Sequence, residues 1–189
     1  NPSPSYHGYD VTDYYAVNPD YGTMEDFNRL LDECHTRGIR VIMDMVLNHT
    51  SIEHPWFQDA LSSPDSDRRN WYVWAEEDPN YRGPWNQEVW YPTVSGYYYA
   101  IFWSGMPDLN YTNPEVTAEM ENVSRFWLDE VGIDGFRLDA IGTIFEDPHF
   151  TPHTVPLDLA GLRHFNDTAH TVEEKQLLAK YWQDMFSHQ

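Results

Sequence analysis

Apolar and polar positions recur with helical spacing over residues 24–37, which predicts an amphipathic helix with one apolar face. Thr23 suits the N-cap of this helix, and Gly38 suits its end. Cys34, the single cysteine, falls on the apolar face, so we expect it in the core and no disulfide within the chain. The apolar positions of the pattern are Met24, Phe27, Leu30, Leu31 and Cys34.

Residues 39–47 are apolar at nearly every position, as in a strand that is buried on both faces. The same order returns later in the chain: Asn113 and Pro114 suit a helix start, an apolar stripe runs to Val131, and Gly132 suits the helix end. Residues 133–139 then read as a second strand. Two helix–strand units predict an α/β fold with a parallel sheet.

The stretch between these units, residues 49–112, is far longer than an ordinary loop. It holds six of the 8 tryptophans and seven of the 13 tyrosines, and we interpret it as a small inserted subdomain with irregular strands around 87–103. The predicted organisation is therefore 1–48, the insertion 49–112, and 113–189. Within the last part, residues 172–187 have an apolar face that predicts a helix.

The formal net charge of −20 argues against nucleic acid and against an anionic membrane surface as partners, because both attract basic proteins. No apolar run approaches the ~20 residues of a membrane span. A neutral, hydroxylated substrate is compatible with this charge. Composition leaves the localisation open between cytoplasmic and secreted.

The segment GFRLDA, residues 135–140, reads as a short buried strand that ends in charged groups. Side chains two positions apart in a strand share a face, so Arg137 and Asp139 are expected to project together while Phe136 and Leu138 pack the other way. A cation beside a carboxylate favours its ionised form. That form is the one a carboxylate nucleophile needs.

Four segments, in this order, give the chain a resemblance to the α-amylase family of retaining glycoside hydrolases. They are YHGYD (6–10), DMVLNH (44–49), MPDLN (106–110) and GFRLDA (135–140). The resemblance implies a partial (β/α)8 TIM barrel with a small irregular subdomain inserted after its third strand. It also implies that the chain covers the second-to-fourth-strand part of the barrel, with the remainder of the same catalytic domain as a partner.

The resemblance assigns Asp139 as the nucleophile that would form a covalent glycosyl-enzyme, and Arg137 as the residue that holds it ionised and oriented. Such enzymes act on α-linked glucans. The general acid of the family is a glutamate on the strand after GFRLDA, and no residue of this chain matches it. We therefore expect the isolated 189-residue chain to be inactive.

The other matching positions would surround the substrate. His49 matches a histidine that hydrogen-bonds the sugar at the cleavage point, Tyr9 matches an aromatic residue that stacks on the same sugar, and His7 lies beside it. Asp44 and Asp10 are expected to orient neighbouring groups rather than react. Several tryptophans of the insertion could line a sugar cleft, although most are expected to form the subdomain core; they are Trp56, Trp71, Trp85, Trp90 and Trp103.

Asn48 and Asp108 match positions that bind a structural Ca²⁺ in many family members. Ca²⁺ requires six to eight oxygen ligands. A Lys-His pair that often follows the nucleophile, and assists both calcium and substrate binding, is replaced here by residues 140–143, Ala-Ile-Gly-Thr. Calcium is therefore left open, and the substrate preference shifts from long glucans toward oligosaccharides.

The expected function is thus a retaining glycosidase that acts on α-1,4-linked glucans or maltooligosaccharides. Alternatives within the family are an α-glucosidase, or a transglucosidase such as trehalose synthase, and the motifs do not separate them. A different class would be a non-catalytic carbohydrate-binding or transporter-associated homologue. The hypothesis of a non-catalytic homologue predicts loss of the nucleophile, whereas Asp139, Arg137 and His49 are all present.

Overall fold

The computed structural model describes residues 1–144, which form one compact unit. The helix expected over residues 172–187 lies outside the described residues, as does most of the predicted part 113–189.

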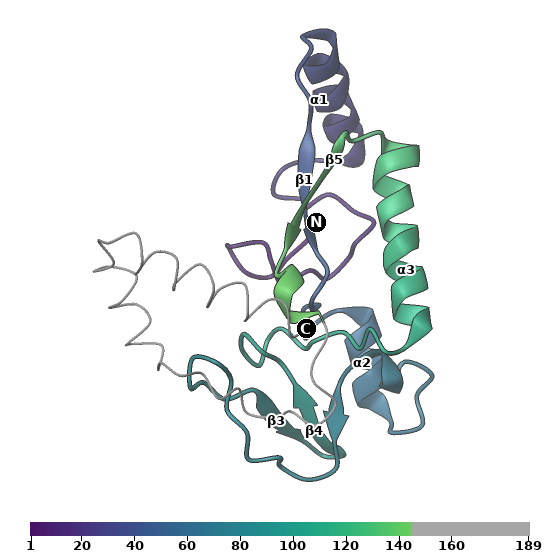
Figure 1. The fold of residues 1–189 in the computed structure, drawn as a ribbon. Helices are drawn as coiled ribbons and strands as arrows, with labels where there is room; N and C mark the ends of the chain where they lie inside the picture. Colours follow the sequence, from purple (N-terminus) through teal and green to yellow (C-terminus); the bar gives the residue numbers. More distant parts are fainter. Residues whose placement is uncertain (145–189) are drawn as a thin grey trace, which may run out of the picture. The chain divides into compact units, whose positions relative to one another are not determined.

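Two parallel strands, β1 (Ile42–Val46) and β5 (Gly135–Asp139), form the part of the sheet that the sequence predicted (Figure 1). Their register pairs Ile42 with Gly135 and Val46 with Asp139, so both strands end at the same edge. The predicted α/β arrangement with a parallel sheet is confirmed. The polar residues that follow each strand are thereby brought together.

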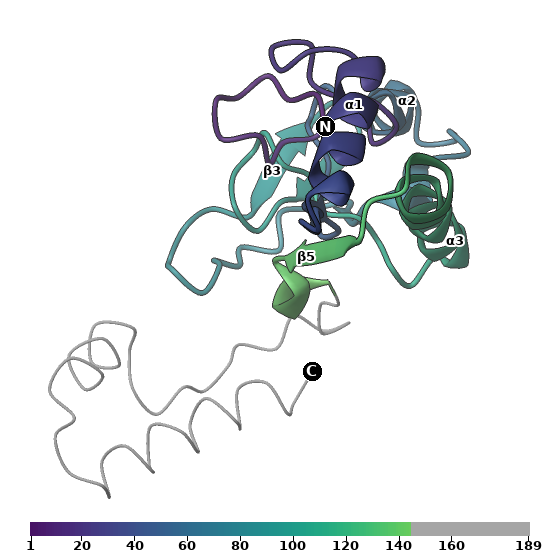
Figure 2. The ribbon, with the colours of Figure 1, turned by 90° about the horizontal axis from the view of Figure 1, so that it is seen from above.

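The two predicted helices are confirmed, and in Figure 2 α1 lies above β5 whereas α3 lies to its right. Helix α1 (Met24–Thr36) begins with a reciprocal capping interaction between Thr23 and Asp26, and Gly38 follows its end with a φ of +72°. Helix α3 (Pro114–Arg125) continues as a wider π-helical segment, η2 (Phe126–Val131), and ends at Gly132 with a φ of +89°.

The inserted segment contains a small antiparallel sheet in the order β2-β4-β3, which confirms the strands expected around 87–103. It also contains helix α2, which the sequence pattern did not predict because 8 residues show barely two turns of periodicity. A short helix, η3 (Ile141–Thr143), follows β5. The elements of the insertion are α2 (Pro55–Ser62), η1 (Arg69–Trp71), β2 (Trp74–Ala75), β3 (Trp90–Thr93) and β4 (Gly96–Tyr99).

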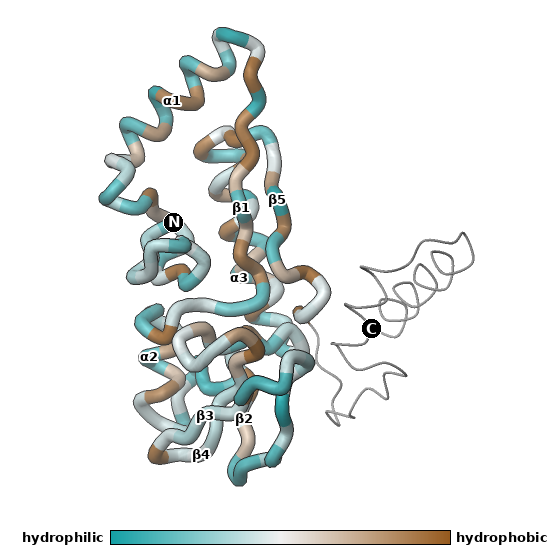
Figure 3. The backbone as a smooth tube through the Cα atoms, turned by 90° about the vertical axis from the view of Figure 1, so that its left-hand side faces the viewer, coloured by the Kyte–Doolittle hydropathy of each residue, from teal (hydrophilic) through white to brown (hydrophobic). Residues whose placement is uncertain are grey.

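Burial along the parallel strands is lower than the sequence predicted. Most residues of β1 and of the segment just before it are hydrophobic (Figure 3). Nevertheless Ile42 is 63% exposed, and Leu138 of β5 is 49% exposed. Each of these strands has one hydrogen-bonded neighbour among the described residues, so large parts of their side-chain surface have nothing to pack against there. The expectation of fully buried strands is wrong for residues 1–144. Cys34 is also half-buried rather than in the core, because α1 buries Leu31 alone among its described side chains.

One hydrophobic core runs through both the barrel part and the insertion. It joins Phe57 and Tyr72 of the insertion to Val46 of β1 and Trp127 of η2. The predicted boundaries at 48/49 and 112/113 thus do not coincide with a break in packing, and the domain division stays a prediction. No helix within residues 1–144 is long and apolar enough to cross a membrane.

The start of α2 places a buried histidine against aromatic rings. The His54 side chain accepts a hydrogen bond from the Trp56 N–H at 3.1 Å, and the two rings lie 4.3 Å apart between centroids. His54 is 3% exposed, and burial lowers its pKa to about 3. The folded protein therefore keeps His54 neutral at pH values where the unfolded chain, with a histidine pKa of about 6.5, binds a proton.

Because the unfolded state binds the extra proton, this histidine should make the free energy of unfolding fall as the pH drops from about 6.5 toward 4. Asparagine is a good N-cap residue and does not titrate. The variant His54→Asn should therefore reduce the pH slope of unfolding by up to about 1.4 kcal/mol per pH unit in this range. Urea unfolding at several pH values measures the slope, and an unchanged slope would contradict the assignment.

Candidate active site at the strand ends

Arg137, the central residue of β5, is shared by two carboxylates, Asp44 in β1 and Asp139 at the carboxyl end of β5. The strand register sets Asp44 opposite Arg137, and Arg137 Nη1 lies 3.3 Å from Asp44 Oδ1. The same Nη1 donates a hydrogen bond to Asp139 Oδ1, so Arg137 and Asp139 do project to one face, as predicted. The hydrogen bond and charge of Asp139, assisted by Asp44, raise the pKa of Arg137. Asp139 is thus held in one orientation by a permanent cation.

The two carboxylates, Asp44 and Asp139, differ in their exposure to solvent. The Asp139 side chain is 22% exposed, whereas that of Asp44 is 48% exposed. Directly after Asp139, Ala140 adopts a left-handed conformation with a φ of +50°, which is uncommon for a residue with a Cβ. This residue turns the chain away from the strand direction and leaves Asp139 at the rim of the sheet.

Asp139 opens into a cavity of about 310 Å³. Three of the residues predicted to bind substrate share this cavity with it, although two come from the loop of residues 1–22 and one from the segment after β1. Its lining consists of His7, Tyr9, His49, Phe102, Trp103, Met106 and Asp139. The strand ends, the loop of residues 1–22 and the insertion therefore meet at one place.

His49 forms the buried base of the cavity, with 1% exposure. Its Nε2 lies 3.1 Å from the Tyr9 carbonyl oxygen, which can accept but not donate, so Nε2 carries the proton. Burial lowers the pKa of His49 to about 4, although the Tyr9 carbonyl and the charge of Asp139 oppose this effect. The ring is therefore neutral near pH 7, and it packs edge-on against Phe102 at 5.2 Å.

Tyr9 and His7 form an adjoining aromatic wall. Their rings are stacked at 6.0 Å with an interplanar angle of 19°, and the Tyr9 N–H donates to His7 Nδ1 at 3.1 Å. The Tyr9 hydroxyl lies 3.5 Å from Asp44 Oδ2. Asp44 therefore contacts both Tyr9 and Arg137, and its orienting role stays a prediction.

Asp10 is buried behind this wall and does not line the cavity. It accepts hydrogen bonds from the hydroxyl groups of Ser3 and Ser5. These contacts fix the loop that carries Tyr9, so Asp10 can act on the site through the loop backbone. Neither serine was predicted, because a serine in a polar loop belongs to no periodic pattern or motif.

Asn48 and Asp108, the predicted calcium ligands, are neighbours in the fold. His49 and Asp108 form an antiparallel bridge, and the Leu109 N–H donates to the Asn48 carbonyl oxygen at 2.9 Å. Asp108 Oδ1 accepts a hydrogen bond from the Ile101 N–H at 3.1 Å, whereas the buried Asn48 Oδ1 has no hydrogen-bond partner among residues 1–144. The described residues contain no group of three or more His, Cys, Asp or Glu that could hold a metal ion.

The tryptophans of the insertion differ in exposure, and Trp56 and Trp74 are partly buried against the core. Trp71 and Trp90 are buried, as expected of a subdomain core, whereas Trp85 and Trp103 are 51% and 46% exposed. Trp103 lines the cavity together with Phe102 and Met106. Neither Phe102 nor Met106 was expected as a site residue, although Met106 is the first residue of the MPDLN segment and Phe102 lies four residues before it.

Comparison with known proteins places these residues in a family. The family model described as "Alpha amylase, catalytic domain" matches residues 1–188. Alpha-amylase 3 of Dictyoglomus thermophilum is 51% identical over 146 residues, which are 77% of this chain and 28% of that protein. Trehalose-6-phosphate hydrolase of Bacillus subtilis is 46% identical over 151 residues, or 76% of this chain and 27% of that protein.

Solved structures similar to this chain come from the same family. Bacillus licheniformis trehalose-6-phosphate hydrolase superposes with a TM-score of 0.74 at 41% identity, covering 78% of this chain and 28% of that structure. The α-amylase from H. orenii gives 0.69 at 43% identity, covering 95% of this chain and 34% of that structure. The chain spans less than a third of the length of the curated relatives named here. It belongs to the α-amylase family of glycoside hydrolases and forms part of that family's (β/α)8-barrel catalytic domain.

Proposed function

We propose that the full-length protein is a retaining glycosidase that acts on α-1,4-linked glucans or maltooligosaccharides through a covalent glycosyl-enzyme on Asp139. The observation that carries the proposal is the position of Asp139. It stands at the end of β5, bonded to Arg137, in one cavity with Tyr9 and His49. Catalytic residues of (β/α)8 barrels occupy this end of the strands.

In this proposal the remaining residues bind and orient. Tyr9 and His7 present ring faces to the sugar bound at Asp139, and His49 closes the base of the site as a neutral ring. Retaining glycosidases need a second carboxyl group about 5–5.5 Å from the nucleophile. Among the described residues that line the cavity, Asp139 is the one carboxylate, so the acid/base group is expected from another part of the catalytic domain.

Charge in the cavity bears on the substrate class. The described lining contains no lysine or arginine, and the nearby Arg137 is engaged by Asp44 and Asp139. Among residues 1–144, the cavity lining thus offers a phosphate group no lysine or arginine partner. The product assay therefore includes trehalose 6-phosphate, the sugar named in one of the relatives, beside neutral oligosaccharides.

A transglucosidase is the second candidate, because trehalose synthase of Thermus thermophilus is 46% identical over 147 residues. It would use the same nucleophile, and an α-glucosidase would use the same site. Incubation of the full-length protein with maltose, maltotriose, trehalose and trehalose 6-phosphate, followed by chromatography of the products, separates these activities. Glucose release from maltotriose supports the glycosidase, trehalose from maltose supports the transglucosidase, and no turnover of any of these substrates would refute both.

A structural Ca²⁺ at Asn48 and Asp108 is also proposed. The donors are of the type calcium prefers, and the buried Asn48 Oδ1 without a hydrogen-bond partner in residues 1–144 fits a cation ligand. These two residues would supply a minority of the six to eight oxygens that calcium requires, so further ligands must come from outside this pair. The ion would stabilise the contact between the end of β1 and the insertion.

Chelation tests the calcium proposal without an activity assay. The melting temperature of the full-length protein is expected to fall by several degrees in EGTA and to recover with millimolar Ca²⁺, because an ion bound by the folded state stabilises it. Asn48→Ala should abolish this response, whereas Asn110→Ala, at a partly exposed asparagine of the MPDLN segment, should retain it. Equal melting temperatures of the unmodified protein with EGTA and with Ca²⁺ would exclude the site.

A further inference from the structure

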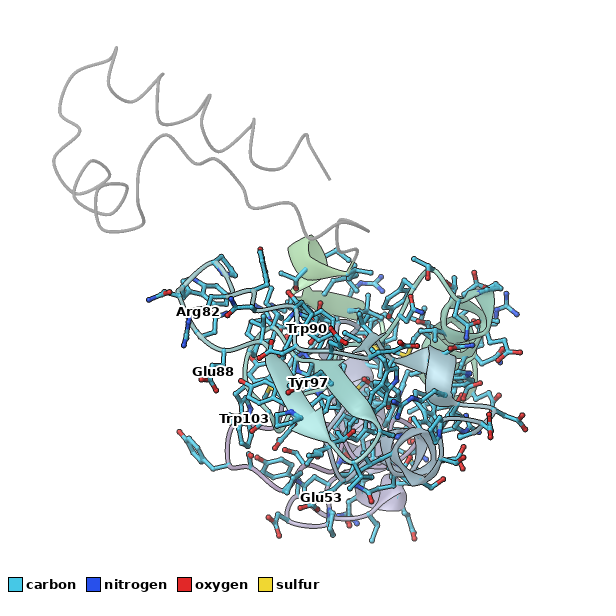
Figure 4. All side chains as sticks on the ribbon, turned by 90° about the horizontal axis from the view of Figure 1, so that it is seen from below. Glu53, Arg82, Glu88, Trp90, Tyr97 and Trp103 are labelled. Atoms are coloured by element: carbon cyan, nitrogen blue, oxygen red, sulfur yellow. The ribbon has the colours of Figure 1, made fainter. Side chains whose placement is uncertain are left out.

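Trp103 is a large apolar side chain in the wall of the cavity, and 46% of its surface is exposed. In Figure 4 it lies toward the outside of the side-chain packing, on the same side of the picture as Arg82 and Glu88 of the insertion. Exposing an indole ring to water is unfavourable. A rigid apolar surface at the mouth of a cavity is typical of a ligand-binding wall.

Gly105 allows the indole to occupy this position. A Cβ atom at residue 105 would lie 2.3 Å from Cη2 and from Cζ2 of Trp103, far inside van der Waals contact. The φ angle of Gly105 is outside the left-handed range, so the glycine is required for the space it leaves and not for its backbone conformation. The six-membered ring of Trp103 therefore rests directly on the backbone of Gly105.

The backbone beneath the ring is fixed by contacts on both sides. The Gly105 carbonyl oxygen accepts a hydrogen bond from the Ile52 N–H at 2.8 Å, which ties the turn to the chain after β1. The Ser104 carbonyl oxygen accepts one from the Tyr98 hydroxyl at 2.7 Å, which ties it to β4. A platform held in this way loses little conformational entropy when a ligand binds.

We infer that Trp103, seated on Gly105, is a stacking surface for the glycosyl residue next to the one held at Asp139. The inference rests on the proposed function and adds to it a residue that selects oligosaccharides over single sugars. Sugar rings present apolar C–H faces that pack on aromatic rings. Trp103 of the insertion and Asp139 of β5 line the same cavity of about 310 Å³. Adjoining sugar residues of one oligosaccharide can therefore contact both side chains.

Binding, measured apart from turnover, tests this inference. In the full-length protein with Asp139→Asn, which leaves bound sugar intact, calorimetry gives the Kd of maltotriose and of glucose. Adding Trp103→Ala should weaken maltotriose binding by about tenfold more than glucose binding, and Trp103→Phe should recover most of the loss. Gly105→Ala, which keeps the indole but displaces it, should also weaken maltotriose selectively.

Maltotriose affinity that is unchanged in both Trp103→Ala and Gly105→Ala would overturn the inference, as would the absence of any maltotriose binding before these changes. An equal loss for glucose and maltotriose would also count against it, because it would indicate general damage to the cavity. Turnover of maltotriose by the unmodified protein tests the proposed function separately. Maltotriose binding that depends on Trp103, without turnover, would therefore refute the proposed glycosidase function and still support Trp103 as a sugar-binding surface.

Discussion

Replacing Asp139 with asparagine in the full-length protein is expected to lower kcat on maltotriose by at least roughly 10⁴-fold. The amide has nearly the same shape, and its oxygen can still accept the hydrogen bond that Arg137 Nη1 donates to Asp139. It is not a nucleophile, however, so the covalent glycosyl-enzyme cannot form. Steady-state kinetics measures the loss, and an unchanged melting temperature shows that the fold is retained.

Asp44→Asn is the matched control, because it removes a carboxylate from the same arginine. Asp44 lies 3.3 Å from Arg137 Nη1 but does not line the cavity, and its side chain is 48% exposed. We expect a loss of kcat at least roughly 100-fold smaller than that of Asp139→Asn, since the affected group orients its neighbours and does not react. Comparable losses in the two variants would mean that Asp139 acts through charge alone and is not the nucleophile.

Truncation of Trp127 to alanine is expected to destabilise the folded protein by about 3–5 kcal/mol, the range for large aromatic residues in a core. Trp127 is 1% exposed, packs edge-on against Phe27 at 5.7 Å, and donates a hydrogen bond from Nε1 to the Tyr14 carbonyl oxygen at 2.7 Å. The Tyr14 hydroxyl in turn lies 2.8 Å from the His49 carbonyl oxygen. Loss of Trp127 should therefore also loosen the loop that carries Tyr9.

Denaturant unfolding compares this variant with two others. Trp127→Phe keeps most of the apolar volume and loses the hydrogen bond, so it should cost about 1–3 kcal/mol and remains measurable if the alanine variant fails to fold. Leu128→Ala changes the adjacent residue, which is 39% exposed, and should cost less than about 1 kcal/mol. A Trp127→Ala variant as stable as Leu128→Ala would show that this core contact is not required.

The sequence predicted regular elements well where their formation depends on neighbouring residues, as in helix caps and strand periodicity. Thr23 and Asp26 form the expected helix start, and Gly38 and Gly132 take positive φ angles after their helices. Arg137 and Asp139 share a face because strand geometry alone requires it. Helix α2 was missed because its cap, His54, is an unusual N-cap residue and its length gives little periodicity.

Predictions about burial were less accurate, since burial depends on what surrounds an element. Residues 39–47 have the composition of a doubly covered strand, yet Ile42 is 63% exposed among the described residues. Four tryptophans of the same aromatic-rich insertion differ in burial: Trp85 and Trp103 are exposed, whereas Trp71 and Trp90 are buried. Side-chain type cannot distinguish a core tryptophan from a binding-wall tryptophan.

Short motifs and backbone periodicity were enough to predict the family, the parallel pair of strands and the carboxylate at the end of β5. Three contacts became visible in the fold and not before: Tyr9 and His49 share a cavity with Asp139, Asp44 competes for Arg137, and Gly105 seats Trp103 at the cavity wall. These contacts join segments far apart in the chain. Their distances follow from packing and strand register, which no local pattern encodes.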